Sequence, residues 1–163
     1  MDARVTRGIW RRSVLMLGLL SGAMPVVHAA EPAPTCAVTN AERHLSVRVT
    51  GMRSDKGNLT VTVYPDDADR FLSRGGKLLR LRVSIVLPMT EACFVLPAAG
   101  NYAVAVYHDA NDDHDFNRNF VGLPAEGYGF SNNPVTKLGL PTFKEVRFDT
   151  QPGNNPIYIK LTY

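Results

Sequence analysis

Short stretches in which apolar and polar residues alternate constrain the fold of this chain more than any other feature. In residues 45–50, for example, leucine and valine alternate with serine, arginine and threonine. A period of two with β-branched residues is typical of a strand with one buried face. The same pattern predicts strands at 45–50, 59–63, 79–85, 92–96, 143–148 and 157–163, and an apolar run predicts a seventh at 101–108. It therefore indicates an all-β fold, an antiparallel β-sandwich of about seven strands, immunoglobulin-like or prealbumin-like.

Three stretches depart from this alternation. Residues 101–108 are apolar at almost every position, which predicts a central strand covered on both faces. Residues 66–74 predict a short helical turn with Asp66 or Asp67 as its N-cap. Residues 109–141 carry no strand pattern. Because loops beyond about 15 residues are uncommon in compact domains and are often functional, this long loop is the place to search for a site.

The first thirty residues are typical of a secretory signal peptide. Four arginines lie within the first twelve positions, the apolar core at 13–27 is too short to span a bilayer, and small residues follow. We expect a signal peptide at 1–30, with cleavage after Ala29 or Ala30; an uncleaved anchor is the alternative, and the export route stays open between the general and the twin-arginine pathways. The remaining 31–163 is expected to be a single β-sandwich domain without a membrane span, periplasmic or secreted.

The charge balance excludes one class of partner. The whole chain carries 18 basic and 15 acidic residues, but the signal segment holds four of the bases and one of the acids. The exported chain is therefore expected to be neutral overall, without the basic excess typical of a nucleic-acid-binding protein.

Two cysteines, Cys36 and Cys93, remain after the signal segment. In an exported chain such a pair is expected to form one disulfide, and two free thiols are the alternative. Closing a loop of this length stabilises a fold by about 4 kcal/mol when the geometry permits it.

An unusual density of oxygen-bearing side chains opens the long loop, in the stretch DANDDHDFNRNF. Asp109, Asn111, Asp113 and Asp115 stand at alternate positions, and Glu126 follows downstream. Ca²⁺ takes about six to eight oxygen ligands, and D-x-[DN]-x-[DN] is how many calcium loops begin. We therefore expect these five residues to hold Ca²⁺. The alternative is a series of turns in which Asp and Asn side chains bond the loop's own backbone.

The loop is not an EF-hand. His114 occupies the sixth position, where an EF-hand has Gly, and Phe120 occupies the twelfth, where it has a bidentate Glu. A calcium loop of another architecture remains open.

Further side chains near this loop suggest two other roles. His108, Glu126 and Asp109 would be the residues of a small hydrolase, although the chain contains no established catalytic motif. His108 is alternatively a structural histidine bonded to a carboxylate or a loop carbonyl.

Aromatic residues between glycines form the second candidate, in the stretch EGYGFSNNP. Tyr128, Phe130 and Asn132 could stack on and bond a sugar or a peptide, or the two rings could fold back and fill the open end of the sandwich.

The stretches YAVAVYHDANDD, FVGLPAEGYGFSNNP and PTFKEVRF resemble a bacterial family of exported proteins known as domain of unknown function 2141. The family's loop reads like D-x-N-x-N-G-x-x-D-x-N, which Asp109, Asn111, Asp113 and Asn119 match. His114 stands where the family tends to have Gly, and Asn117 where it tends to have Asp; both departures weaken the calcium inference.

The family implies no biochemical activity, so the function has to be inferred from the residues. We expect a periplasmic binding or envelope accessory module whose Asp/Asn loop is ordered by Ca²⁺. Its partner would be a glycan, a peptide or an envelope protein. The alternative is the small hydrolase.

Overall fold

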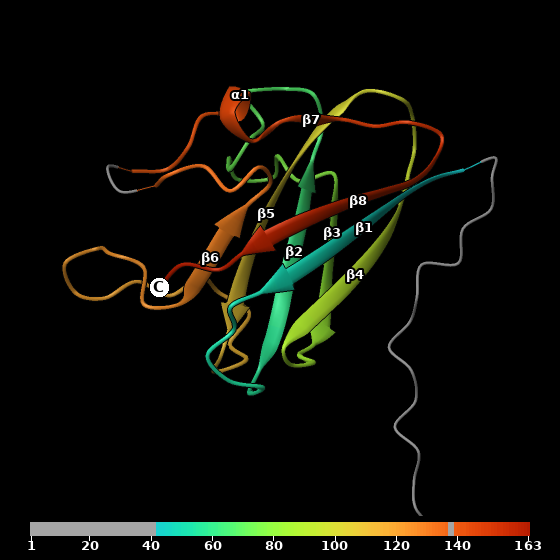
Figure 1. Ribbon diagram of the computed structural model, residues 1–163. Helices are drawn as coiled ribbons and strands as arrows, with labels where there is room; N and C mark the ends of the chain where they lie inside the picture. The colour runs from blue at the N-terminus through green and yellow to red at the C-terminus, as the bar shows by residue number, and fades with distance from the viewer. Residues whose placement is uncertain (1–41, 137–138) are drawn as a thin grey trace, which may run out of the picture. The chain divides into compact units, whose positions relative to one another are not determined.

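The computed structural model describes residues 42–136 and 139–163, which form two packed β-sheets (Figure 1). The first sheet has the order β4-β1-β8, from β1 (Arg43–Thr50), β4 (Met89–Leu96) and β8 (Gly153–Lys160). The second has the order β3-β2-β5-β6, from β2 (Asn58–Tyr64), β3 (Leu79–Ser84), β5 (Asn101–Asp109) and β6 (Gly127–Phe130). A short strand, β7 (Phe148–Asp149), also pairs with β5. With one short helix in the described part, α1 (Phe143–Val146), the predicted all-β sandwich is confirmed.

The pairing is antiparallel throughout the second sheet and between β1 and β4. β1 and β8 instead run parallel, with Val47 opposite Ile157 and Val49 opposite Ile159. The strand order places β8 at an edge of the first sheet, which is where a proline such as Pro156 is tolerated in a strand.

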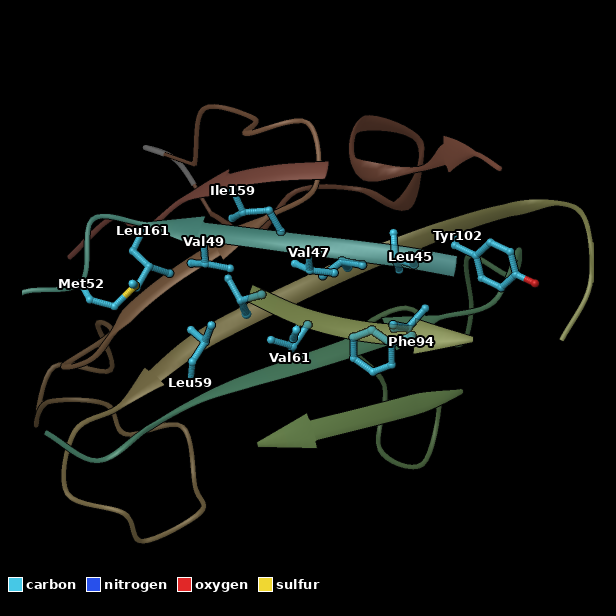
Figure 2. Packing of buried hydrophobic residues seen from close by; sticks show 14 of the residues in the cluster. Leu45, Val47, Val49, Met52, Leu59, Val61, Phe94, Tyr102, Ile159 and Leu161 are labelled. Carbon is cyan, nitrogen blue, oxygen red and sulfur yellow. The ribbon is translucent and has the colours of Figure 1, made fainter. Parts of the chain in front are cut away.

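The alternating residues form the core between the sheets. In Figure 2 the side chains of β1 at 45, 47 and 49 point toward those of β2 at 59 and 61. Leu45, Val47 and Val49 are completely buried, as are Leu59 and Val61. Because each such side chain contributes about 1.5–3 kcal/mol when fully buried, this layer is the main source of stability.

A second, smaller apolar cluster lies on the outer face of the second sheet. It contains Tyr64, Ala103, Phe130, Phe143 and Val146, with Phe71 and Leu72 packed against it. The cluster covers one end of that face and explains why β5 is apolar on both sides, as predicted. The rest of the face is left open between the loops.

The prediction of a strand over 143–148 is wrong for most of its length. Phe143–Val146 forms α1, begun by a capping box in which the Thr142 backbone N–H and hydroxyl both bond Glu145 Oε2 at 2.7 Å. Phe143 and Val146, three positions apart, share the helix face that enters the second cluster. Only the two residues of β7 remain extended.

The helical turn predicted at 66–74 is a series of hydrogen-bonded turns instead. Asp67 still acts as a cap, because its Oδ1 accepts the N–H of Asp69 at 2.9 Å and of Arg70 at 3.3 Å. The backbone then leaves the helical region at Leu72, where φ is 55°. This conformation lets Phe71 and Leu72 both reach the second cluster.

The loop predicted at 109–141 contains a strand that periodicity missed. β6 reads GYGF, and its two glycines remove the strand signal. Each glycine is required by close packing: a Cβ on Gly127 would lie 2.3 Å from the Tyr163 ring, and one on Gly129 would lie 2.7 Å from Ile159. β8 likewise begins at Gly153, before the predicted start at 157.

The predicted signal peptide and Cys36 lie outside the described residues. Cys93 lies on β4, opposite Ser46 of β1. Because Cys36 is not described, the Cys36–Cys93 disulfide stays a prediction. Within residues 42–136 and 139–163, no helix is long and apolar enough to cross a membrane.

Candidate functional site

Asp109, the last residue of β5, organises the start of the long loop. Its carboxylate is completely buried. Oδ1 accepts the backbone N–H of Asp113 at 3.2 Å, and Oδ2 accepts that of His114 at 3.0 Å and the Asn58 amide at 3.3 Å. The side chain therefore folds the next five residues back over the end of the strand, as an Asx-type turn does.

Asp113 repeats this arrangement one turn later. Its Oδ1 accepts the N–H of Asp115 at 2.9 Å, while Oδ2 accepts the amides of Asn117 at 3.0 Å and Asn111 at 2.8 Å. These donors, with that of Asn117 foremost, lower the pKa of the Asp113 carboxyl below 3.8. Much of the oxygen in this loop is thus bonded to the loop's own amides and backbone.

Two residues of the Asp/Asn stretch at the start of the loop have left-handed backbone geometry. The φ of Asp112 is 59° and that of His114 is 68°. His114 stands at the sixth position from Asp109, where calcium loops place Gly for a sharp turn. The backbone thus makes the turn that the family's Gly would make, because His and Asp tolerate this region better than bulkier residues do.

Glu126 returns to the loop from the start of β6. It is buried, and its Oε2 accepts the backbone N–H of Asn117 at 3.0 Å. Burial raises the pKa of Glu126, and the nearby Asp109 and Asp113 raise it further against the opposing hydrogen bonds. Negative charge is therefore concentrated where β5 meets the loop.

One set of metal-ligating side chains converges in the described residues, and it differs from the predicted set. Ligand atoms of Asp109, Asp112 and His114 all lie within 4.8 Å of one another. Asp112 was not among the predicted ligands. It also accepts a hydrogen bond from the Asn58 amide, and its Oδ1 lies 3.5 Å from His114 Nε2.

The remaining predicted ligands lie outside that set. Asn111, Asp113 and Asp115 are exposed, Asp113 bonds other groups of the loop, and Glu126 bonds the loop backbone. Ca²⁺ prefers oxygen ligands, so the two carboxylates of this set supply only part of a calcium shell and backbone or amide oxygens would have to complete it.

His108 is buried, with both ring nitrogens bonded. Nε2 lies 2.9 Å from the Lys56 carbonyl oxygen, and Nδ1 lies 2.7 Å from the Tyr163 hydroxyl. Because a carbonyl only accepts, Nε2 carries the proton and Nδ1 accepts from the hydroxyl. This leaves neither nitrogen to act as a general base, and the geometry gives no support to a hydrolase.

The three other predicted binding residues have different environments. Asn132 donates its amide to the carbonyls of Glu145 at 3.2 Å and Arg147 at 2.9 Å, which holds α1 against the sheet. Phe130 is buried in the second cluster, while Tyr128 is half-buried and lines a groove. Phe130 thus folds back as the alternative expected, but onto the outer face of the second sheet, whereas the Tyr128 ring stays partly accessible.

The groove lies on the open part of the second sheet's outer face. Sheet register builds it from a row of four residues: Arg80 pairs with Thr62, Thr62 with Ala105, and Ala105 with Phe130. The small side chains in the middle of this row form the floor, and the cation and the ring stand at its ends. The groove has a volume of about 210 Å³.

Aromatic rings form one wall of the groove. Phe116 makes edge-on contacts with Tyr107 at 5.6 Å and with Tyr128 at 6.0 Å between ring centroids, and Tyr128 continues the series to Phe130 at 6.0 Å. The Arg118 guanidinium lies 5.3 Å from the centre of the Phe116 ring and donates to the Gly122 carbonyl. The Asp/Asn loop therefore contributes a ring and a cation to the groove.

Sequence reasoning missed most of these groove residues. Tyr107 and Arg80 stand on the less buried faces of predicted strands, and Phe116 and Arg118 lie inside the loop that drew attention for its oxygens. The alternation in each strand indicated which of its residues share a face. The order and register of the strands decide which residues of different strands lie side by side on that face.

Fold and site together define a class of protein: a two-sheet β-sandwich in which a turn-rich acidic loop borders an aromatic groove. Figure 1 shows this loop, in gold, extending to the left of β6. The chain belongs to the DUF2141 family, described as an uncharacterized protein conserved in bacteria, whose model matches residues 47–158. The resemblance stated from the sequence is thus confirmed. No curated protein and no solved structure matches the chain.

Proposed function

We propose that the protein is an exported binding module that holds its ligand in the aromatic groove. The observation that carries this proposal is the convergence of Tyr107, Tyr128 and Phe116 around a floor of small side chains. Flat rings beside an open hollow are typical of sites that bind by stacking and exclusion of water. Export to the periplasm or the outside remains the expectation from the signal-like first thirty residues.

The groove lining favours binding over catalysis. It consists of aliphatic and aromatic side chains, one threonine and two arginines, and it includes no carboxylate, imidazole or thiol. These are the groups that most often transfer protons or attack a substrate, and of the other acid–base groups the lining offers only tyrosine phenols. An accessory role in binding is therefore the function that this geometry supports best.

Ca²⁺ is proposed as the ion that orders the loop. Asp109 and Asp112 would supply buried and exposed carboxylates, and Asn111, Asp113, Asp115 and Glu126 are the remaining oxygen donors of the segment. The left-handed turn at His114 and the raised pKa of Glu126 support this proposal, because a cation would relieve the repulsion among the acids. Its role would be to fix Phe116 and Arg118 beside the groove.

The metal proposal is tested by calorimetry on the exported chain. Ca²⁺ is expected to raise the melting temperature, and a chelator is expected to reverse the rise. Asp112→Asn should reduce the shift, whereas Asp66→Asn, an exposed acid outside the loop, should leave it intact. Melting curves that are the same with Ca²⁺ and with chelator would refute the metal proposal and leave the groove proposal untouched.

The binding proposal is tested by NMR of the chain with ¹³C-labelled tyrosine rings. A panel of soluble oligosaccharides and peptides is titrated in, and the ring signals are followed. A ligand of the groove should shift Tyr107 and Tyr128 but leave Tyr158, which is exposed on the first sheet, unchanged. A panel that moves no signal, or moves Tyr158 alone, would argue against the groove.

A further inference from the structure

A second cavity adjoins the aromatic groove and is bordered by cations. Its volume is about 400 Å³, and its wall includes Arg74, Lys77 and Arg80. Tyr64, Leu72 and Arg80 line both cavities, so the two adjoin at these residues. A ligand in the groove can therefore extend along the surface toward three positive charges.

These cations are not neutralised by the described protein. Among residues 42–136 and 139–163, none of Arg74, Lys77, Arg80 or Arg118 lies within 4.0 Å of a carboxylate, although Arg48 pairs with Glu91. Neither cavity has an Asp or Glu in its wall. The two linings therefore carry cations without carboxylates, while the acids of the neighbouring loop lie outside them.

Two of the guanidinium groups are held in place by the protein. Arg80 donates Nε–H to the Thr62 hydroxyl at 2.8 Å, and Arg118 donates from Nη1 to the Gly122 carbonyl at 2.9 Å. A guanidinium has five N–H donors, so each retains donors for a ligand. Fixed guanidinium donors in the lining of an aromatic groove are suited to planar anionic groups such as carboxylates.

The floor of the groove argues against a peptide added as a strand. The backbone groups of β2, β5 and β6 that lie beneath it are paired with one another in the sheet, and the groove lies on a face rather than an edge. What remains available are ring faces and cations. The groove is smaller than the roughly 300–1,000 Å³ of enclosed small-molecule sites, so it suits one ring of a longer chain.

We propose that the ligand is an acidic oligosaccharide, with one sugar ring stacked against Tyr128 and Phe116 and a carboxylate held by Arg80 beside Arg74 and Lys77. This inference rests on the proposed binding function and specifies its ligand class. Ring stacking supplies the apolar contact, and the cations select carboxylated sugars over neutral ones.

Titration calorimetry on the exported chain tests this with three probes: trigalacturonate, maltotriose and a hexaglutamate peptide. Trigalacturonate is expected to bind most tightly, and its affinity should fall as salt rises. Arg80→Gln and Tyr128→Ala should each weaken it about tenfold, as expected for loss of a charged hydrogen bond or a stacked ring. Arg80→Lys should retain part of the affinity, and Lys144→Gln, an exposed cation on α1, should retain all of it.

The possible failures are distinguishable. Equal binding of maltotriose would overturn the anionic class and leave the groove function standing. A second failure is that hexaglutamate binds as tightly as trigalacturonate, with an affinity that Tyr128→Ala does not change. That result would show that charge alone attracts the ligand and would overturn the proposal of an oligosaccharide. If no probe binds but another ligand in the tyrosine NMR panel shifts Tyr107 and Tyr128, the ligand class is wrong and the groove stands. If nothing shifts those rings, both proposals fail.

Discussion

The imidazole of His108 and the phenol of Tyr163 are joined by a 2.7 Å hydrogen bond that ties the end of β5 to the chain's last residue. The Tyr163 hydroxyl also accepts the backbone N–H of Arg53 at 3.0 Å, and the Arg53 guanidinium lies 4.0 Å from the centre of the Tyr163 ring. His108 thus has a structural role at the base of the loop, where it connects three segments that are far apart in the sequence.

Tyr163→Phe should destabilise the protein by about 1–3 kcal/mol, because it leaves the buried Nδ1 of His108 without a donor. Urea denaturation measures the change. Tyr158→Phe is the matched control: its hydroxyl bonds Arg48 on an exposed face, so its loss should cost little. Equal losses of unfolding free energy for the two substitutions would show that the buried His108–Tyr163 hydrogen bond contributes no more to stability than the exposed one.

Gly127→Ala should also destabilise the fold, by about 1–3 kcal/mol, because the added Cβ would lie 2.3 Å from the Tyr163 ring. Thermal melting measures the loss. Gly122→Asn is the control, since nothing lies within 4 Å of a Cβ there and Asn tolerates the φ of 81°. An unchanged melting temperature for Gly127→Ala would contradict the close packing of Tyr163 on β6.

Glu126→Gln should stabilise the metal-free protein at neutral pH. Burial, and then Asp109 and Asp113, raise the pKa of Glu126 above 4.5, so the folded chain holds this proton more tightly than the unfolded chain does. The stability contributed by Glu126 is therefore highest below pH 4.5 and falls as pH rises through the raised pKa.

Melting temperatures of wild type and Glu126→Gln, measured in chelator from below pH 4.5 up to neutral pH, check the direction of this pH dependence. The advantage of the variant should be largest near neutrality and should disappear on acidification. Asp113 titrates in the opposite sense, since its lowered pKa adds stability that is lost at low pH, but this contribution is common to both proteins. An advantage that grows toward low pH would contradict the account.

The two phenylalanines of the loop should respond differently to substitution. Phe120 is fully exposed, so Phe120→Ser should leave stability within about 0.5 kcal/mol of wild type. Phe116 contacts Tyr107 and Tyr128, so Phe116→Ser should lower the melting temperature and remove one wall of the groove. Scanning calorimetry on both variants measures the contrast, and equal effects would show that the loop does not pack as described.

Alternation of side chains was sufficient to predict most strands, because burial of one face is what stabilises them. It failed where another constraint applied. β6 needs glycines at 127 and 129 to admit Tyr163 and Ile159, and α1 follows from the capping residues Thr142 and Glu145 rather than from apolar period. The expected central position of residues 101–108 was correct, because its apolar outer face meets the second cluster.

The candidate site was predictable only in part. The Asp/Asn spacing located the loop, and the turn-forming alternative anticipated the many bonds from Asp109 and Asp113 to backbone N–H groups. Asp112 was missed because it lies out of step with the alternate positions. The groove could not be predicted, since Arg80 comes to lie beside Thr62, and Phe130 beside Ala105, only through the order of strands in the sheet.

The central claim is that the ligand occupies the groove, and filling the groove tests it most directly. Ala105 is half-buried on the floor between Thr62 and Phe130, so Ala105→Phe would place a ring in the hollow. The account predicts that this variant keeps a wild-type fold, as judged by its NMR spectrum outside the groove, and loses affinity for the ligand that shifts Tyr107 and Tyr128. A folded Ala105→Phe variant that binds this ligand with unchanged affinity would contradict the claim.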